Sequence, residues 1–229
     1  MRLLGLLGGM SWTSTESYYR GLNEGVAARL GGLHSARLVL HSVDFAPVAE
    51  AQHAGDWAAT ARTLSDAARG LNAAGAEAML LATNTMHKVA DEVEAAAGVP
   101  LLHIADPTAE VLLAAGHRRV GLLATRFTME DTFYTARLEA RGLEVVVPGP
   151  ADRELVHRVI YDELVHDDVR DDSRQAYLEV VGRLADAGAE AVVLGCTEIG
   201  LLLRDGDADL PFADTTALHV AAGVDWLCS

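Results

Sequence analysis

Short apolar runs alternate with longer amphipathic stretches along most of this chain of 229 residues. The apolar runs of the first half predict strands near 3–8, 37–43, 78–82 and 100–104. The amphipathic stretches between and after them predict helices near 13–29, 57–73, 85–97 and 107–115. The same order recurs from about 119 to 227. Strands that alternate with helices are typical of parallel sheets flanked by helices, so the pattern predicts an α/β fold.

Three segments of the first half recur in the second half in the same order. Residues 5–7 match 121–123 at an offset of 116, residues 74–78 are identical to 187–191 at 113, and residues 105–106 match 213–214 at 108. Slowly shrinking offsets indicate a duplication followed by loop shortening, and chance similarity between alanine-rich helices is the alternative. We expect two similar lobes related by pseudo-twofold symmetry, each a parallel sheet flanked by helices. The expected first lobe contains 1–98 plus a C-terminal helix at about 214–229, and the second contains 99–213.

Composition and charge narrow the class of protein. Half of the residues are apolar, which is enough for a substantial core. A net charge of −15 argues against nucleic acid as a partner, because phosphate binding depends on Lys and Arg. No apolar segment approaches the roughly 20 residues that span a bilayer, and the apolar start of the chain is short and broken by glycine, as in a buried strand. We therefore expect no membrane association.

Two residue types are scarce enough to be informative. The two cysteines, Cys196 and Cys228, form no disulfide framework, so a reducing cytoplasm is the expected location. Lys88 is the only lysine, so a pyridoxal phosphate cofactor would have to use it or be absent. The nine histidines, among them His53, His87 and His103, show no metal-binding spacing, and we expect most of them at the surface or at the edge of the core.

Polar side chains follow two apolar runs that occupy equivalent places in the repeat. Thr83 follows the run near 78–82, and Cys196 follows its counterpart near 191–195. Ligands of parallel α/β sheets bind outside the carboxyl ends of the strands, so we expect Thr83 and Cys196 to line one cleft between the lobes. A strand end followed by a helix can lower a thiol pKa from about 8.5, whereas the alternative for Cys196 is a buried, inert thiol. Cys228 has no such context, and we expect it to be packed or on the surface.

The neighbours of these residues have two readings each. One reading is that they are helix N-caps, and the other is that they bind a carboxylate or a developing enolate; both roles can coexist. The residues are Asn84, Thr85, Thr197 and Glu198. Gly8-Gly9 leaves the first strand without the lysine of a P-loop, so this turn predicts cleft lining rather than nucleotide binding.

The equivalent turn after the fifth expected strand carries two threonines. Thr125 and Thr128 are candidates for hydrogen bonds to a ligand. Arg126 is either a third ligand-binding candidate or a solvated surface residue. Asp106 and Asp214 each precede a residue typical of a helix start, and we expect both to be N-caps.

Six motifs together cover nearly the whole chain. They are Gly8-Gly9-Met10-Ser11-Trp12 with Ser14-Thr15, Ser42-Val43-Asp44-Phe45 with Gln52, Thr83-Asn84-Thr85-Met86-His87-Lys88, Leu123-Ala124-Thr125-Arg126-Phe127-Thr128, Ile160-Tyr161, and Leu194-Gly195-Cys196-Thr197-Glu198. As a set they resemble the aspartate/glutamate racemase superfamily, most closely its amino-acid racemase branch. The resemblance implies two α/β lobes, usually homodimers, and racemisation of a small amino acid without pyridoxal phosphate, other cofactor or metal.

The resemblance also implies roles for individual residues. In the family pattern a cysteine from each lobe flanks the substrate Cα, and the two positions here are Thr83 and Cys196. The motifs also imply a set of substrate-binding residues, to which we add Glu198 from the last motif. The full set is Met10, Gln52, Asn84, Thr85, Thr125, Thr128, Thr197 and Glu198.

Two departures from the family pattern limit the inference. Thr83 replaces the first cysteine, as in a branch described as specific for the L enantiomers of aspartate and glutamate. The arginine and lysine that bind substrate carboxylates in aspartate racemases have no equivalents near 47–50 or near Val165. Which amino acid is used therefore stays open. Two alternatives also stay open: a decarboxylase of the arylmalonate decarboxylase type, which keeps only the second cysteine, and an amino-acid-binding protein that has lost activity.

Overall fold

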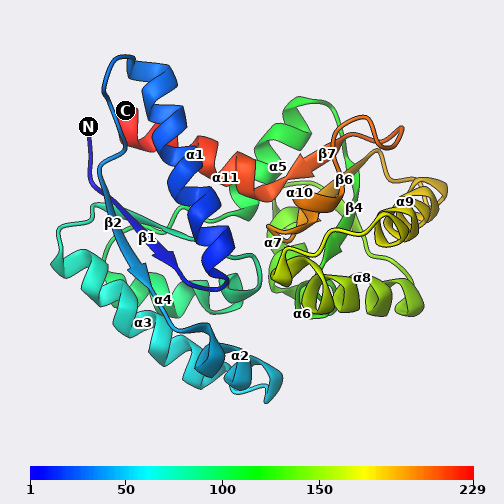
Figure 1. The fold of residues 1–229 in the computed structure, drawn as a ribbon, viewed down its shortest axis with the longest axis horizontal. Helices are drawn as coiled ribbons and strands as arrows, with labels where there is room; N and C mark the ends of the chain where they lie inside the picture. The colour runs from blue at the N-terminus through cyan, green and yellow to red at the C-terminus, as the bar shows by residue number, and fades with distance from the viewer. The chain divides into compact units, whose positions relative to one another are not determined.

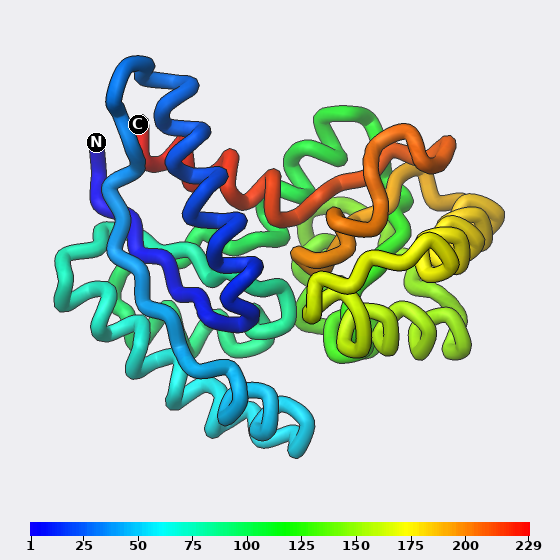
Figure 2. The backbone as a smooth tube through the Cα atoms, viewed as in Figure 1, coloured from blue at the N-terminus to red at the C-terminus, as the bar shows by residue number.

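The computed structural model describes residues 1–229, which form two compact units. Unit 1 contains residues 1–104 and 219–229, and unit 2 contains residues 105–218. Figures 1 and 2 follow the chain through both. The last helix, α11 (Thr215–Cys228), begins in unit 2 and ends in unit 1. None of the helices combines the length and hydropathy that crossing a membrane requires.

The sheet of unit 1 has three parallel strands in the order β2-β1-β3, of which β1 and β2 are labelled in Figure 1. Their bounds are Leu4–Gly8 for β1, Leu38–Ser42 for β2 and Ala78–Leu81 for β3. The strand expected near 100–104 is reduced to a single parallel bridge between Leu101 and Met79. The N–H of Met79 donates to the carbonyl of Pro100, and the N–H of Leu102 donates to that of Met79, both at 2.9 Å. This addition to the sheet explains why unit 1 continues past residue 98.

Alternate side chains of β1 pack on opposite faces of the sheet. Leu4 and Leu6 belong to an apolar cluster with α1 (Trp12–Leu30) and the end of α11. Leu7 belongs to a second cluster, with α3 (Trp57–Ala73) and α4 (Ala90–Ala97). Burial on both faces is why β1 is a continuous apolar run.

Two helical segments of unit 1 differ from the prediction. The helix expected over 85–97 is a 3₁₀ helix, η1 (Thr85–Val89), followed by α4. The sequence analysis did not anticipate α2 (Phe45–His53), which Asp44 caps by accepting the N–H of Ala46 at 3.2 Å. Both differences lie next to the carboxyl ends of strands.

Unit 2 has four parallel strands in the order β5-β4-β6-β7, of which β4, β6 and β7 are labelled in Figure 1. Their bounds are Arg119–Ala124 for β4, Glu144–Val146 for β5, Ala191–Gly195 for β6 and Phe212–Asp214 for β7. The helices are α5 (Ala105–Ala114), α6 (Arg126–Glu130), α7 (Thr132–Ala140), α8 (Pro150–Asp162), η2 (Leu164–His166), α9 (Asp171–Asp186) and α10 (Ile199–Leu202). The α/β fold class with two parallel sheets is thereby confirmed.

The two units repeat one strand register. Leu6 lies opposite Leu80 in unit 1, and at offsets of 116 and 113 Leu122 lies opposite Val193 in unit 2. The glutamate of the repeated segment also keeps its contact. Glu77 Oε1 accepts the N–H of Leu3 at 2.8 Å, and Glu190 Oε2 accepts the N–H of the equivalent Arg119 at 3.2 Å. Shared register and shared contacts favour duplication over chance similarity.

Candidate active site

Cys196 follows directly after β6, at the carboxyl end of the sheet of unit 2. Its thiol is buried and donates to Oε2 of Glu198, with 3.0 Å between sulfur and oxygen. The hydroxyl of Thr197 donates to the same oxygen at 2.5 Å. One carboxylate therefore accepts hydrogen bonds from the two residues that precede it in the chain.

The pKa of the Cys196 thiol is raised well above its usual range, so the expectation of a lowered pKa was wrong. Burial is the largest cause, because it removes water that would stabilise a thiolate. The charge of Glu198 and its hydrogen bond to the thiol raise the pKa further. These effects outweigh the backbone N–H groups of residues 197 and 198, which lower it. Cys196 therefore keeps its proton at neutral pH.

Two threonines leave the neighbouring strand at the same level as Cys196. Ala124 pairs with Gly195, so Thr125 and Cys196 emerge from adjacent strands at the same edge. Thr125 precedes α6 without a side-chain capping bond, and its Oγ1 lies 3.3 Å from that of Thr128. Both threonines are buried. The register thus brings Thr125, Thr128 and Cys196 to one edge of the unit 2 sheet.

Arg126 lies beside these threonines and has partners of its own. Its guanidinium is 3.6 Å from Glu154 and 5.8 Å from the ring centre of Phe127. The Arg126 side chain is 44% exposed. These contacts favour the surface reading of Arg126 over the ligand-binding one.

Thr83 follows β3, at the carboxyl end of the sheet of unit 1. Thr83, Asn84 and Thr85 are all buried. The carbonyl oxygen of Thr83 lies 2.7 Å from Nδ1 of His87. Asn84 precedes η1 but forms no side-chain capping bond with it, which contradicts the N-cap reading of Asn84. Glu198 likewise precedes α10 without a capping bond.

Met10 and Gln52 come from other elements of unit 1. Met10 belongs to the apolar cluster that includes Leu81 and Met86, which flank the Thr83 segment in the sequence. Gln52 is a buried amide in the last turn of α2. Gly9 lies between the end of β1 and Met10 and has a φ of 96°. A Cβ at Gly9 would lie 2.2 Å from the carbonyl oxygen of Val43. Glycine is therefore required sterically in this turn.

Three histidines form a buried cluster in unit 1 that the sequence analysis missed. His87, His103 and His219 are all buried, so these three of the nine histidines are exceptions to the expectation that most lie at the surface or the edge of the core. The ring centre of His87 lies 4.4 Å from that of His103 and 6.0 Å from that of His219. No sequence spacing signals the cluster, because His219 comes from α11. No group of three or more His, Cys, Asp or Glu side chains is arranged to hold a metal ion.

The two aspartates that were expected to cap helices have different roles. Asp214 does cap α11, since its Oδ1 accepts the N–H groups of Thr216 and Ala217 at 2.8 and 3.2 Å. Asp106 lies within the first turn of α5 and forms ion pairs with Arg137 and Arg141, each at 2.8 Å. The capping prediction for Asp106 was therefore wrong, because the residue lies inside α5, where Arg137 of α7 and Arg141 just after α7 face it.

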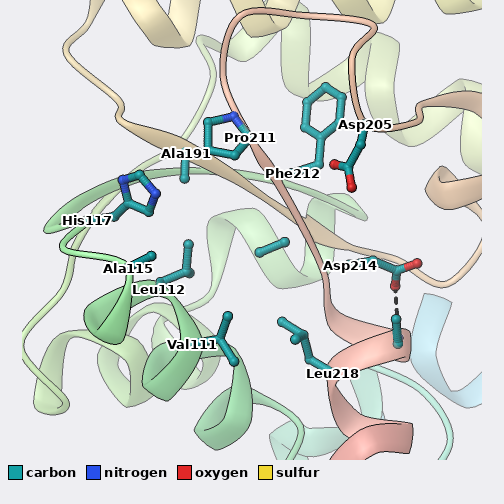
Figure 3. Close-up of a pocket in the computed structure, with 12 residues that line it drawn as sticks. Val111, Leu112, Ala115, His117, Ala191, Asp205, Pro211, Phe212, Asp214 and Leu218 are labelled. Carbon is teal, nitrogen blue, oxygen red and sulfur yellow. Dashed lines mark hydrogen bonds between the residues drawn. The ribbon is translucent and has the colours of Figure 1, made fainter.

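Unit 2 also contains a pocket of about 280 Å³ that none of the predicted site residues lines (Figure 3). Its wall is mainly apolar, with three ionisable groups, and consists of Val111, Leu112, Ala115, His117, Ala191, Asp205, Pro211, Phe212, Ala213, Asp214, Ala217 and Leu218. The capping carboxylate of Asp214 forms part of this wall (Figure 3).

Comparison with known proteins identifies relatives over almost the full chain. Residues 7–223 match the model of the Asp/Glu/hydantoin racemase family. The crystal structure of a candidate Asp/Glu racemase from Yersinia pestis is 50% identical, covers 100% of both chains and has a TM-score of 0.94. An aspartate racemase homologue from Pyrococcus horikoshii OT3 is 32% identical, also covers 100% of both chains and has a TM-score of 0.87. A glutamate racemase from Synechococcus sp. is 33% identical over 126 residues, which are 55% of this chain and 45% of that enzyme.

Proposed function

This chain belongs to the Asp/Glu/hydantoin racemase family, and we propose that it racemises aspartate, glutamate or a related small amino acid without a cofactor. In this proposal Cys196 and Thr83 exchange protons with opposite faces of one substrate Cα. The observation that carries it is the hydrogen bond from the Cys196 thiol to Glu198 at the carboxyl end of β6. Family relatives named as aspartate and glutamate racemases support the substrate class.

A protonated cysteine cannot act as a base, and in this proposal Glu198 accepts its proton. Because burial keeps Cys196 in the thiol form, the sulfur must lose its proton before it can accept the one on Cα. We assign this step to Glu198, which accepts the thiol proton as the sulfur takes the Cα proton. In the reverse direction the same thiol donates its proton to the carbanion, and Glu198 returns a proton to the sulfur. The proton count balances in both directions.

Thr83 is assigned to the opposite face as a proton donor. A hydroxyl has a pKa near that of water, roughly seven units above the value of about 8.5 for a thiol. Seven units at about 1.4 kcal/mol each amount to roughly 10 kcal/mol, so Thr83 does not act as a resting base. Racemisation has an equilibrium constant of one, so kcat/KM must be equal for both enantiomers. The Thr83 face must therefore also work in reverse, and a water held by Thr83 would supply the base.

The remaining residues are assigned to binding of the amino-acid backbone. The hydroxyls of Thr85, Thr125, Thr128 and Thr197 and the amide of Asn84 are candidates to hold the α-carboxylate and the enolate that develops from it. The two positions at which aspartate racemases carry a carboxylate-binding arginine and lysine hold neither residue here, and Arg126 faces Glu154 and Phe127. Neutral amino acids such as homoserine therefore belong among the substrates to test.

Exchange of solvent deuterium into Cα tests the proposal. L-aspartate, L-glutamate and L-homoserine are incubated with the protein in D₂O, and both deuterium content and chirality are followed. We expect deuterium at Cα and a slow rise of the D enantiomer. Cys196→Ser should abolish both, and the matched variant Cys228→Ser should keep them, because it removes only the second cysteine.

Three results would contradict the proposal. Full exchange in Cys196→Ser would remove Cys196 from the reaction. Tight binding of an amino acid with unchanged protium would indicate a binding protein. Release of carbon dioxide from a substituted malonate, with no exchange in amino acids, would indicate the single-cysteine decarboxylase.

A further inference from the structure

Two buried histidines of unit 1 hold residues 102–104: His87 links Ile104 to Thr83, and His219 links Leu102 to Tyr18. The side chains of His87 and His219 are 3% and 0% exposed. Both rings form hydrogen bonds to backbone groups that can act only as donor or only as acceptor. Such partners determine which ring nitrogen carries the proton.

His87 must carry its proton on Nδ1. The N–H of Ile104 points at Nε2 over 3.3 Å, and since an N–H only donates, Nε2 must be the acceptor. A neutral imidazole with Nε2 as acceptor has its proton on Nδ1. Nδ1 therefore donates to the carbonyl oxygen of Thr83, at 2.7 Å. This is the second of two bonds that hold the ring between Thr83 and Ile104.

His219 must carry its proton on the other nitrogen. Its Nε2 lies 2.6 Å from the carbonyl oxygen of Leu102, which only accepts, so Nε2 is the donor. In the neutral ring Nδ1 then accepts from the hydroxyl of Tyr18 at 2.8 Å. His87 and His219 thus require opposite tautomers, and they hold the same three-residue segment at Leu102 and at Ile104.

His87 stays in its neutral form around neutral pH. Burial is the main reason that its pKa lies well below the usual histidine value, and the nearby His103 and His219 lower it further. The carbonyl groups of Thr83 and Asn84 act in the opposite direction without restoring the ordinary value. One tautomer is therefore present without a titration step near neutral pH.

We propose that His87 is a positioning residue, which through its Nδ1–H tautomer fixes the carbonyl of Thr83 and with it the direction in which the Thr83 side chain leaves β3. The catalytic part of this inference rests on the role proposed for Thr83. The hydrogen-bond network of His87, Ile104 and Thr83 stands independently of that role.

Two substitutions at one position separate donor from acceptor. In His87→Asn the amide Nδ2 replaces Nδ1 and can still donate to the carbonyl of Thr83. In His87→Gln the longer side chain places its amide near the position of Nε2. The amide oxygen can accept the N–H of Ile104, but nothing then donates to the carbonyl of Thr83. We expect kcat for exchange to fall about 10- to 100-fold in His87→Gln, as for a reacting group displaced by about 1 Å, with KM within about threefold of wild type. His87→Asn should keep most of the activity.

Tyr18→Phe is the matched control for the other histidine. It removes the bond to His219 and leaves the bond to Thr83 intact, so its kcat should stay within about twofold of wild type. Equal loss of kcat in His87→Asn and His87→Gln would overturn the positioning role. So would a loss in Tyr18→Phe as large as that in His87→Gln, because general damage to the cluster would then explain both.

A spectroscopic measurement tests the network without any enzyme activity. Long-range ¹H–¹⁵N spectra of protein labelled with ¹⁵N-histidine distinguish the two tautomers, and the two His87 variants identify its signals. We expect His87 as the Nδ1–H form and His219 as the Nε2–H form, unchanged from pH 6 to 8. An Nε2–H or doubly protonated His87 would overturn the inference. If the tautomers are as expected and wild type shows no exchange, the proposed function fails while the network stands.

Discussion

The thiol of Cys196 donates a hydrogen bond of 3.0 Å to the carboxylate of Glu198, two residues further along the chain. Both side chains are buried, so the hydrogen bond between them lies away from bulk water. A thiol that keeps its proton at neutral pH is a ready acid and needs a partner to act as a base. The short spacing places that partner within the same turn of chain.

Glu198→Gln should separate the two effects of this carboxylate. Removing the negative charge takes away one cause of the raised Cys196 pKa, so the midpoint for alkylation of Cys196 by iodoacetamide should move to lower pH. Exchange at Cα should nevertheless fall about 10²- to 10⁴-fold, because the general base is lost. Both are measured in a Cys228→Ser background to leave one thiol. Unchanged exchange would show that Glu198 does not take the thiol proton.

Thr83→Cys should raise the rate of racemisation. A thiol on the second face is roughly seven pKa units more acidic than the threonine hydroxyl and can work in both directions. Thr83→Val keeps the shape and removes the hydroxyl, so it should still permit exchange by Cys196 while lowering formation of the other enantiomer. Chiral chromatography and Cα deuterium, followed in one sample, distinguish the two activities. Equal racemisation by wild type and Thr83→Val would remove Thr83 from the mechanism.

The free energy of unfolding should fall as the pH drops below about 6.5. Burial lowers the pKa of His87 in the folded protein, so in acid the unfolded chain binds a proton that the folded protein does not. The contribution is fully present above the unfolded pKa and is lost as the pH falls toward the folded one, by up to about 1.4 kcal/mol per pH unit. Urea unfolding at pH 7.5, 6.5 and 5.5 measures it. His87→Asn should have a shallower slope, and parallel slopes would refute this assignment.

Gly9→Ala should destabilise unit 1 far more than Gly142→Ala destabilises unit 2. Both glycines have similar φ values, 96° and 101°. A Cβ at Gly142 meets nothing within 4 Å, whereas one at Gly9 meets the backbone of Val43 at 2.2 Å. We expect about 1–2 kcal/mol for Gly142→Ala from backbone strain alone and at least about 3 kcal/mol for Gly9→Ala, since the connection from β1 to α1 must shift away from Val43. An equal decrease of the urea midpoint in Gly9→Ala and Gly142→Ala would contradict the steric argument.

The sequence by itself determined the order of strands and helices and the points where the strands end. Apolar period and repeat offsets are local properties, so they located β1, β3 and β6 and the polar residues that follow them. The offsets predicted a duplication, and the shared register agrees with it, because a duplicated segment that buries the same side chains must pair in the same way. Family motifs added the candidate residues themselves.

Only the tertiary structure decided what surrounds those residues. The raised pKa of Cys196 depends on burial, which follows from packing across the whole unit and overrides the local effect of a helix start. Asp106 meets Arg137 in place of a capped helix end, and His87 meets Ile104 and a histidine of α11. These contacts join residues distant in sequence, and no periodic pattern encodes them because side-chain packing is set by all neighbouring elements together.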